Sequence, residues 1–169
     1  MPDNYWMFFV SAIIPIIVGF IWYHPKVFGT AWMRINGLKE QDLEGGNMVL
    51  ILGLSFLLGV FLSFGLSGLV IHQGNVFQMM MPNIMEAGSA EQLQYNDLMA
   101  QYGNSHRGFG HGALHGGLAT VVFALPIIAI NALFERRGGK YIMIHFGYWF
   151  LTLLLMGGLL CQTLVYSPL

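Results

Sequence analysis

The chain has 169 residues, of which 56% are hydrophobic and only 9% are charged, and its formal net charge is −1. Soluble domains usually carry about 25% charged residues, so these values exclude an ordinary water-soluble fold and indicate lipid as the surrounding of the apolar surface. Without a net positive charge or a nucleotide-binding motif such as a Walker loop, the chain is not expected to bind nucleic acid.

Four long apolar stretches predict an all-α protein, an integral membrane bundle of four transmembrane helices in a single domain, residues 1–169. A spanning helix needs roughly 20 apolar residues. The predicted spans are residues 5–23, 48–71, 110–134 and 141–165. Pro15 and Pro126 lie inside the first and third spans, where proline removes a backbone hydrogen bond and bends a helix. No positive charge precedes Lys26, so the first span is expected to be retained rather than cleaved as a signal peptide.

Two of the connecting segments show helical patterns of their own. Residues 25–35 combine apolar and basic positions at helical spacing, which predicts a short helix in the inner membrane interface that stops at Gly37. The long outer connection, 72–109, contains Ser89 and Gln92 in the spacing of a capping box. We expect an amphipathic helix near 90–102, resting on the outer surface or contacting a partner.

The basic residues are segregated, and this predicts the orientation. Six of the seven Lys and Arg residues lie in the segments 24–47 and 135–140, and Arg107 is the exception. With four spans these two segments share one side, which the positive-inside rule assigns to the cytoplasm. Both termini and the 72–109 connection are therefore expected on the outer, periplasmic side.

Several segments resemble a known family. They are residues 19–29 (GFIWYHPKVFG), 31–33 (AWM), 53–57 (GLSFL), 131–137 (NALFERR), 147–148 (GY) and 156–157 (MG). Together they resemble the bacterial Domain of Unknown Function 1761 family, over nearly the whole chain except about 73–107. The resemblance implies a small multi-pass protein of the bacterial cytoplasmic (inner) membrane, and it implies no activity and no catalytic residues.

A group of histidines is the strongest candidate for chemistry. His111 and His115 lie four residues apart, so a helix would present both imidazoles on one face. His72 ends the second predicted span on the same side, and His106 lies just upstream of the third. A packing or interfacial role for each imidazole is the first interpretation. The alternative is a metal or haem site at the outer rim, formed by His72, His111 and His115 with His106 as a further ligand.

Other features leave alternatives open. The run of methionines in residues 79–85 offers soft ligands for Cu⁺, but it also suits a flexible apolar face on lipid or a partner. No charged residue or histidine falls near the middle of any predicted span, which weighs against a pump that relays protons. Small residues in the second and fourth spans favour close helix packing, within one chain or between chains.

Three functions follow, in this order. The first is a non-catalytic accessory or assembly subunit that forms a homo-oligomer or joins other membrane subunits. The second is a metal- or haem-binding membrane protein that uses His72, His111 and His115, with His106 as a further ligand. The third is a small transporter or channel for a neutral or lipid-like substrate. An enzyme acting on lipid ranks below these, because no nucleophile or carboxylate partner is visible.

Overall fold

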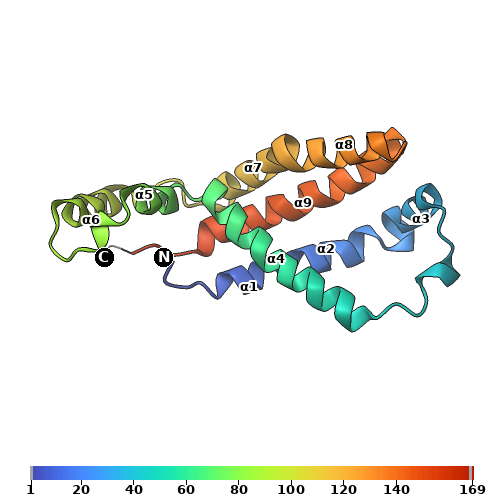
Figure 1. Cartoon of the computed structure of the whole chain (residues 1–169), viewed down its shortest axis with the longest axis horizontal. Coiled ribbons are helices and arrows are strands. Elements are labelled where there is room, and N and C mark those ends of the chain that lie inside the picture. The colour runs from blue at the N-terminus through green and yellow to red at the C-terminus, as the bar shows by residue number, and fades with distance from the viewer. Residues whose placement is uncertain (1, 168) are drawn as a thin grey trace.

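The structure is a computed structural model that describes residues 2–167 and 169. Within that part of the chain every regular element is helical, as the sequence predicts (Figure 1). The α-helices are α1 Met7–Ser11, α2 Ile14–Trp22, α3 Thr30–Asn36, α4 Met48–Val70, α5 His72–Met80, α6 Ala90–Tyr102, α7 Phe109–Ala119, α8 Leu125–Phe134 and α9 Gly139–Thr163. Single turns of 3-10 or π-helix are η1 Pro25–Gly29, η2 Glu40–Leu43, η3 Asn83–Met85 and η4 Thr120–Ala124.

Three helices are long and apolar enough to cross a membrane: α4, the continuous helix Phe109–Phe134, and α9. At 1.5 Å per residue the 23 residues of α4 extend about 35 Å, more than the ~30 Å of a bilayer's hydrocarbon core. These helices begin and end within two residues of the predicted spans. A fourth crossing exists if the pair Met7–Trp22 and Pro25–Asn36, bent by 55°, forms one span.

Helices α7 and α9 run side by side because glycines allow their backbones to touch (Figure 1). A Cβ atom on Gly112 would clash with the carbonyl oxygen of Gly157, and one on Gly116 would clash with that of Leu153. Two glycines spaced four residues apart therefore form the contact face of α7, the arrangement that favours close helix pairs in membranes.

The first predicted span, residues 5–23, corresponds to the helical stretch Met7–Trp22, which is interrupted near Pro15, where the sequence predicts a kink. Helices α1 and α2 are separated at Ala12 and Ile13, just before Pro15. Proline has no N–H to continue the backbone ladder across this point. The Tyr148 hydroxyl on α9 donates to the Pro15 carbonyl oxygen at 3.0 Å, so the neighbouring helix stabilises the break.

The segment that follows forms the predicted short helix, although its first turn is π-helical. Turn η1 leads directly into α3, and Gly37 ends α3 with a left-handed φ of 69°, the conformation expected at such a cap. The Arg137 guanidinium donates to the Ile35 carbonyl oxygen at 3.3 Å. This contact joins the two basic segments, which lie at the same end of the molecule (Figure 1).

At the opposite end, α5, η3 and α6 form a small lobe, named here the α5–α6 lobe (Figure 1). Helix α6 lies where the sequence predicts a helix near 90–102, and the Ser89 hydroxyl caps it by accepting from the Gln92 backbone N–H at 3.1 Å. Tyr95 and Met99 of α6 are buried against α5 and η3. The apolar face of α6 is therefore covered within the chain. Helix α5 was not predicted.

Both termini lie beside this lobe. The Asp3 N–H donates to the Val165 carbonyl oxygen at 2.9 Å, which joins the two ends of the chain. Asn96 of α6 both donates to and accepts from the backbone of Leu169, at 2.9 and 2.7 Å. The C-terminal segment thus ties the α5–α6 lobe to α9.

Candidate metal centre

A break between α4 and α5 positions the first histidine. Val70 ends α4, Ile71 is extended with φ −123° and ψ 105°, and His72 begins α5. Ile71 is buried in the main core, so the turn is held firmly. Because the chain changes direction at this point, the His72 side chain points toward α7. A straight continuation of α4 would not place it there.

The other two histidines come from one face of α7. His111 and His115 are one helical turn apart, and each is followed by a glycine, Gly112 and Gly116, that packs on α9. Because consecutive residues lie about 100° apart around a helix, glycines on the α9 side leave the histidines on a different side, next to α5. In each His-Gly pair the glycine therefore packs against α9, and the histidine presents its imidazole as a candidate metal ligand.

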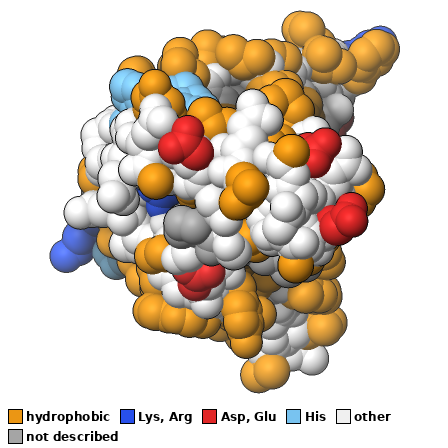
Figure 2. Space-filling view, turned by 90° about the vertical axis from the view of Figure 1, so that its left-hand side faces the viewer, with side chains coloured by type: hydrophobic (Ala, Val, Ile, Leu, Met, Phe, Trp, Pro, Cys, Tyr) orange, Lys and Arg blue, Asp and Glu red, His pale blue; other side chains and the backbone are white. Residues whose placement is uncertain are grey.

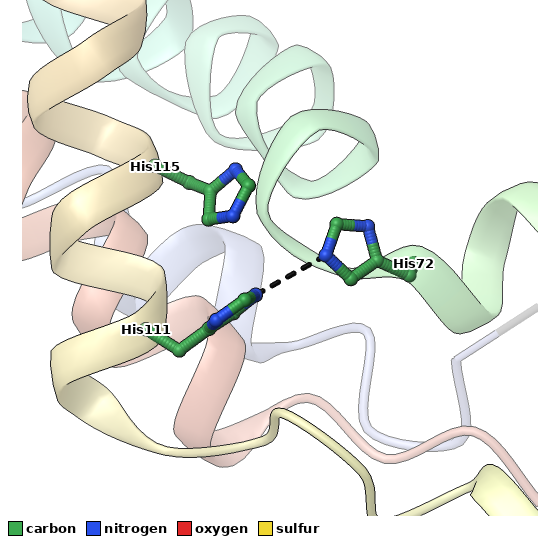
Figure 3. Close-up of side chains that lie close together, drawn as sticks. All are labelled: His72, His111 and His115. Carbon is green, nitrogen blue, oxygen red and sulfur yellow. Dashed lines mark hydrogen bonds between the residues drawn. The ribbon is translucent and has the colours of Figure 1, made fainter.

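The three imidazoles point toward one another (Figure 3). The Nε2 atoms of His72 and His111 are 3.2 Å apart. The ring centroid of His115 lies 5.2 Å from that of His72 and 4.5 Å from that of His111. One ligand nitrogen from each residue can be chosen so that all three lie within 4.8 Å of one another. The structure thus brings together the residues that the sequence analysis singled out.

The separations are close to those of a metal site. Two nitrogens bound to one tetrahedral zinc ion, each about 2.0–2.1 Å from it, are about 3.3 Å apart. The His72–His111 pair at 3.2 Å already meets this geometry. The longest separation, at most 4.8 Å, requires a side-chain rotation that shortens it by about 1.5 Å. In the absence of an ion, a hydrogen bond between one protonated and one unprotonated nitrogen holds the same pair together.

His106 lies next to the three histidines but outside their ligand set. Its ring centroid is 5.1 Å from that of His111. Its backbone has a left-handed φ of 58°, which few residues other than glycine adopt. The thiol of Cys161 donates to its carbonyl oxygen at 3.3 Å. This contact helps to hold the turn between α6 and α7, and His106 remains a neighbour of the site in this conformation.

The cluster is accessible from the surface. His72 is exposed, and His111 and His115 are half-buried. Figure 2 shows histidine side chains at the surface of this end of the molecule, bordered by apolar side chains, with acidic side chains dispersed over the same face. Exchange of a metal ion with the surrounding water is therefore possible without opening the fold.

The remaining candidates lie elsewhere. His24 accepts from the Lys26 backbone N–H at 3.2 Å, and His145 pairs with the Tyr23 hydroxyl at 3.2 Å, both toward the basic end of the chain. In the methionine run, Met80 packs against the buried cluster around Tyr95, and Met79 is exposed. Neither arrangement adds a ligand to the three histidines.

One feature near the site was missed by sequence reasoning. Arg107 is half-buried, and its guanidinium lies 5.8 Å from the ring centroid of Tyr166. Burial lowers the pKa of Arg107 and raises that of Tyr166. Only its position as the one basic residue outside the two basic segments distinguishes Arg107 in the sequence. It fixes the turn beside His106 to the C-terminal segment.

A comparison with protein families agrees with the sequence resemblance. The family model described as "Protein of unknown function (DUF1761)" matches residues 6–161, which includes all three histidines of the cluster. No curated protein and no solved structure shows significant similarity to the chain. The match covers nearly the whole length, and the chain therefore belongs to the DUF1761 family.

Proposed function

We propose that this is a metal-binding membrane protein whose ion is held by His72, His111 and His115. The observation that carries the proposal is the convergence of three ligand nitrogens within 4.8 Å from two separate helical segments. Pairs of histidines often lie together on a protein surface by chance. Here two features of the backbone direct imidazoles to one point: the break between α4 and α5 at Ile71, and the packing of the α7 glycines against α9.

The donor set favours a borderline transition metal, with Zn²⁺ as the first choice. Neutral imidazoles bind Zn²⁺, Cu²⁺, Ni²⁺ and Fe²⁺, whereas Ca²⁺ and Mg²⁺ prefer oxygen ligands. Haem is disfavoured because two axial histidines stand on opposite sides of the iron, about 4 Å apart at metal–nitrogen distances near 2 Å. The His72–His111 separation of 3.2 Å supports a bare ion.

The proposal includes a placement in the membrane. The stretch Met7–Trp22 contributes the fourth span, and Pro25–Asn36, bent away from it by 55°, lies in the interface. The basic segments face the cytoplasm of a bacterial cell, so the α5–α6 lobe, the termini and the metal site lie on the outer side.

Metal content tests the proposal directly. The full chain is purified in mild detergent, freed of metal, titrated with Zn²⁺ and measured by elemental analysis. We expect about one ion per chain, and loss of that ion in His72→Ala, His111→Ala and His115→Ala. His24→Ala is the matched control, because His24 is also exposed but lies at the other end of the chain. Metal-free protein that does not take up Zn²⁺, Cu²⁺ or Ni²⁺ would refute the proposal.

The accessory role that ranked first on sequence remains a second proposal, and one observation favours it. Gly53, Gly65 and Gly68 of α4 would accept a Cβ atom without meeting any atom within 4 Å. In α7, Gly112 and Gly116 are covered by α9, and these open glycines of α4 would suit a helix of another chain in the same way. Native mass spectrometry in detergent tests it, and a monomer without bound protein counts against it.

A further inference from the structure

A cavity of about 410 Å³ adjoins the histidine cluster on the side of the α5–α6 lobe. His72 and His106 line one wall of it. The other walls are mainly apolar and include Val76, Leu98 and Met99, with Ser105 among the few polar groups. Pockets that bind small organic molecules usually measure about 300–1,000 Å³ and have this composition.

Hydrogen bonds and buried side chains hold the walls of this cavity in place. The Gln73 side chain is buried and donates two hydrogen bonds of 2.9 Å, to the carbonyl oxygens of Tyr102 and Ser105. These bonds fasten α5 to the end of α6 and to the turn that carries His106. Met99 belongs to the buried cluster of the lobe. The walls are therefore fixed by internal contacts rather than by a loose loop.

Three imidazoles leave one position of a tetrahedral ion open, and such open sites bind a water or an exogenous ligand. His106 is next to His111, but the set of ligand nitrogens within 4.8 Å consists of His72, His111 and His115. His72 belongs both to that set and to the cavity wall. A molecule seated in the cavity thus contacts a residue that is also one of the proposed metal ligands.

We infer that the cavity binds a small organic ligand with a compact apolar body and one donor atom, and that this donor occupies the open position of the metal. The inference rests on the metal site proposed above. The apolar walls of the cavity favour the apolar body of the ligand, and the metal ion binds its donor atom. A phosphate or other highly charged group is disfavoured, because the walls of the cavity are mainly apolar.

The test uses the full chain loaded with Co²⁺, whose visible spectrum reports its ligands. Phenylimidazole is the probe, and imidazole and cyanide are the comparison ligands. Imidazole carries the donor without the apolar body, and cyanide is too small to depend on the cavity walls. If the cavity holds the phenyl ring, phenylimidazole will bind at least about tenfold more tightly than imidazole.

Two substitutions on α6 provide a matched pair. Leu98 lines the cavity, whereas Leu93 is 63% exposed on the same helix. Leu98→Trp is expected to weaken phenylimidazole binding about tenfold or more and to leave cyanide binding unchanged, and Leu93→Trp is expected to change neither. The comparison of phenylimidazole with imidazole on the unaltered chain decides the question even if Leu98→Trp fails to fold.

The outcomes separate the two proposals. If Co²⁺ binds but phenylimidazole and imidazole bind equally well, the cavity inference is overturned and the metal site stands. Equal phenylimidazole affinity in folded Leu98→Trp and Leu93→Trp overturns it in the same way. If neither Co²⁺ nor Zn²⁺ binds, the metal site itself fails, and the ligand inference fails with it.

Discussion

The Nε2 atoms of His72 and His111 lie 3.2 Å apart, although 39 positions separate the two residues in the sequence. His72 is the first residue of α5, and His111 lies in the first turn of α7. Any ion bound between them joins the α5–α6 lobe to the long helices. The histidine cluster is therefore placed to couple metal binding to the stability of the lobe.

The first prediction concerns this coupling. A ligand that binds only the folded state stabilises it by about 2.7 kcal/mol when present at 100 times its dissociation constant. Addition of Zn²⁺ is expected to raise the thermal unfolding temperature of the chain and of His24→Ala, and to leave that of His72→Ala unchanged. Thermal unfolding in detergent, followed by tryptophan fluorescence, measures the effect. An equal rise in all three proteins would contradict a site at His72.

The second prediction concerns the contact between α7 and α9. Gly112→Ala places a methyl group against the Gly157 carbonyl and is expected to destabilise the protein by roughly 1–3 kcal/mol. Gly110 is the control in the same helix, since a Cβ atom there meets nothing within 4 Å. Gly110→Ala should be neutral or stabilising, because alanine is the better helix former. The same unfolding assay compares them, and equal loss in both variants would refute the contact.

The third prediction concerns the α5–α6 lobe. Tyr95 is 1% exposed, and its ring packs edge-on against Phe77 of α5 at 5.9 Å between centroids. Tyr95→Ala is expected to cost about 3–5 kcal/mol of local stability. Hydrogen exchange of α5 and α6 should accelerate while α9 stays protected. Leu93→Ala, at an exposed site of α6, should exchange like the unaltered chain, and unchanged protection in Tyr95→Ala would show that the lobe does not depend on this contact.

The histidines show how much of the candidate site can be predicted from the sequence. The spacing of His111 and His115 is enough to predict that one helix face presents both. The position of His72 beside α7 depends on the extended backbone of Ile71, which is the last residue of the apolar run before the polar residues His72 and Gln73. Packing of α4 against α7 determines the direction of the chain after this point, and helical periodicity in the sequence does not predict that direction.

Helix α6 and its partner illustrate the same limit. The capping residue Ser89 and the spacing of Tyr95 and Met99 predict the helix and its apolar face. From the sequence, that face is expected to rest on the outer surface or to contact a partner. It is covered by Phe77 and Val76 of α5, a nine-residue helix that opens with polar residues and glycine and lies in the connection 72–109. Local signals identify a face that must be buried, but not the element that buries it.

The fourth prediction concerns alkaline pH. Burial raises the pKa of Tyr166 above its ordinary value of 10.0, and it raises that of Tyr95 as well. Both groups hold their protons more firmly when folded, so stability is retained below pH 10 and falls as the pH rises past it. Tyr166→Phe should reduce this loss, whereas Tyr102→Phe, at an exposed position, should not. Unfolding in denaturant between pH 8 and pH 11 measures the slope, and identical slopes in all three proteins would contradict the assignment.

The fifth prediction concerns orientation. Six basic residues gather at the end that carries α3 and the α8–α9 turn, so that end is expected to face the cytoplasm. Single cysteines are introduced at exposed positions, Glu91→Cys in the lobe and Lys39→Cys in the basic segment, on a Cys161→Ala background. A thiol reagent that does not cross the membrane should label Glu91→Cys in intact spheroplasts and Lys39→Cys only after lysis.

The labelling also decides which compartment supplies the metal. A lobe on the outer side exposes His72, His111 and His115 to the metal ions of the periplasm, where binding does not compete with the cytoplasmic buffers. Labelling of Lys39→Cys in intact spheroplasts, with Glu91→Cys protected, would reverse the topology and place the histidine cluster in the cytoplasm. Zn²⁺ added outside intact spheroplasts should then fail to protect the lobe from hydrogen exchange, whereas the expected topology predicts immediate protection.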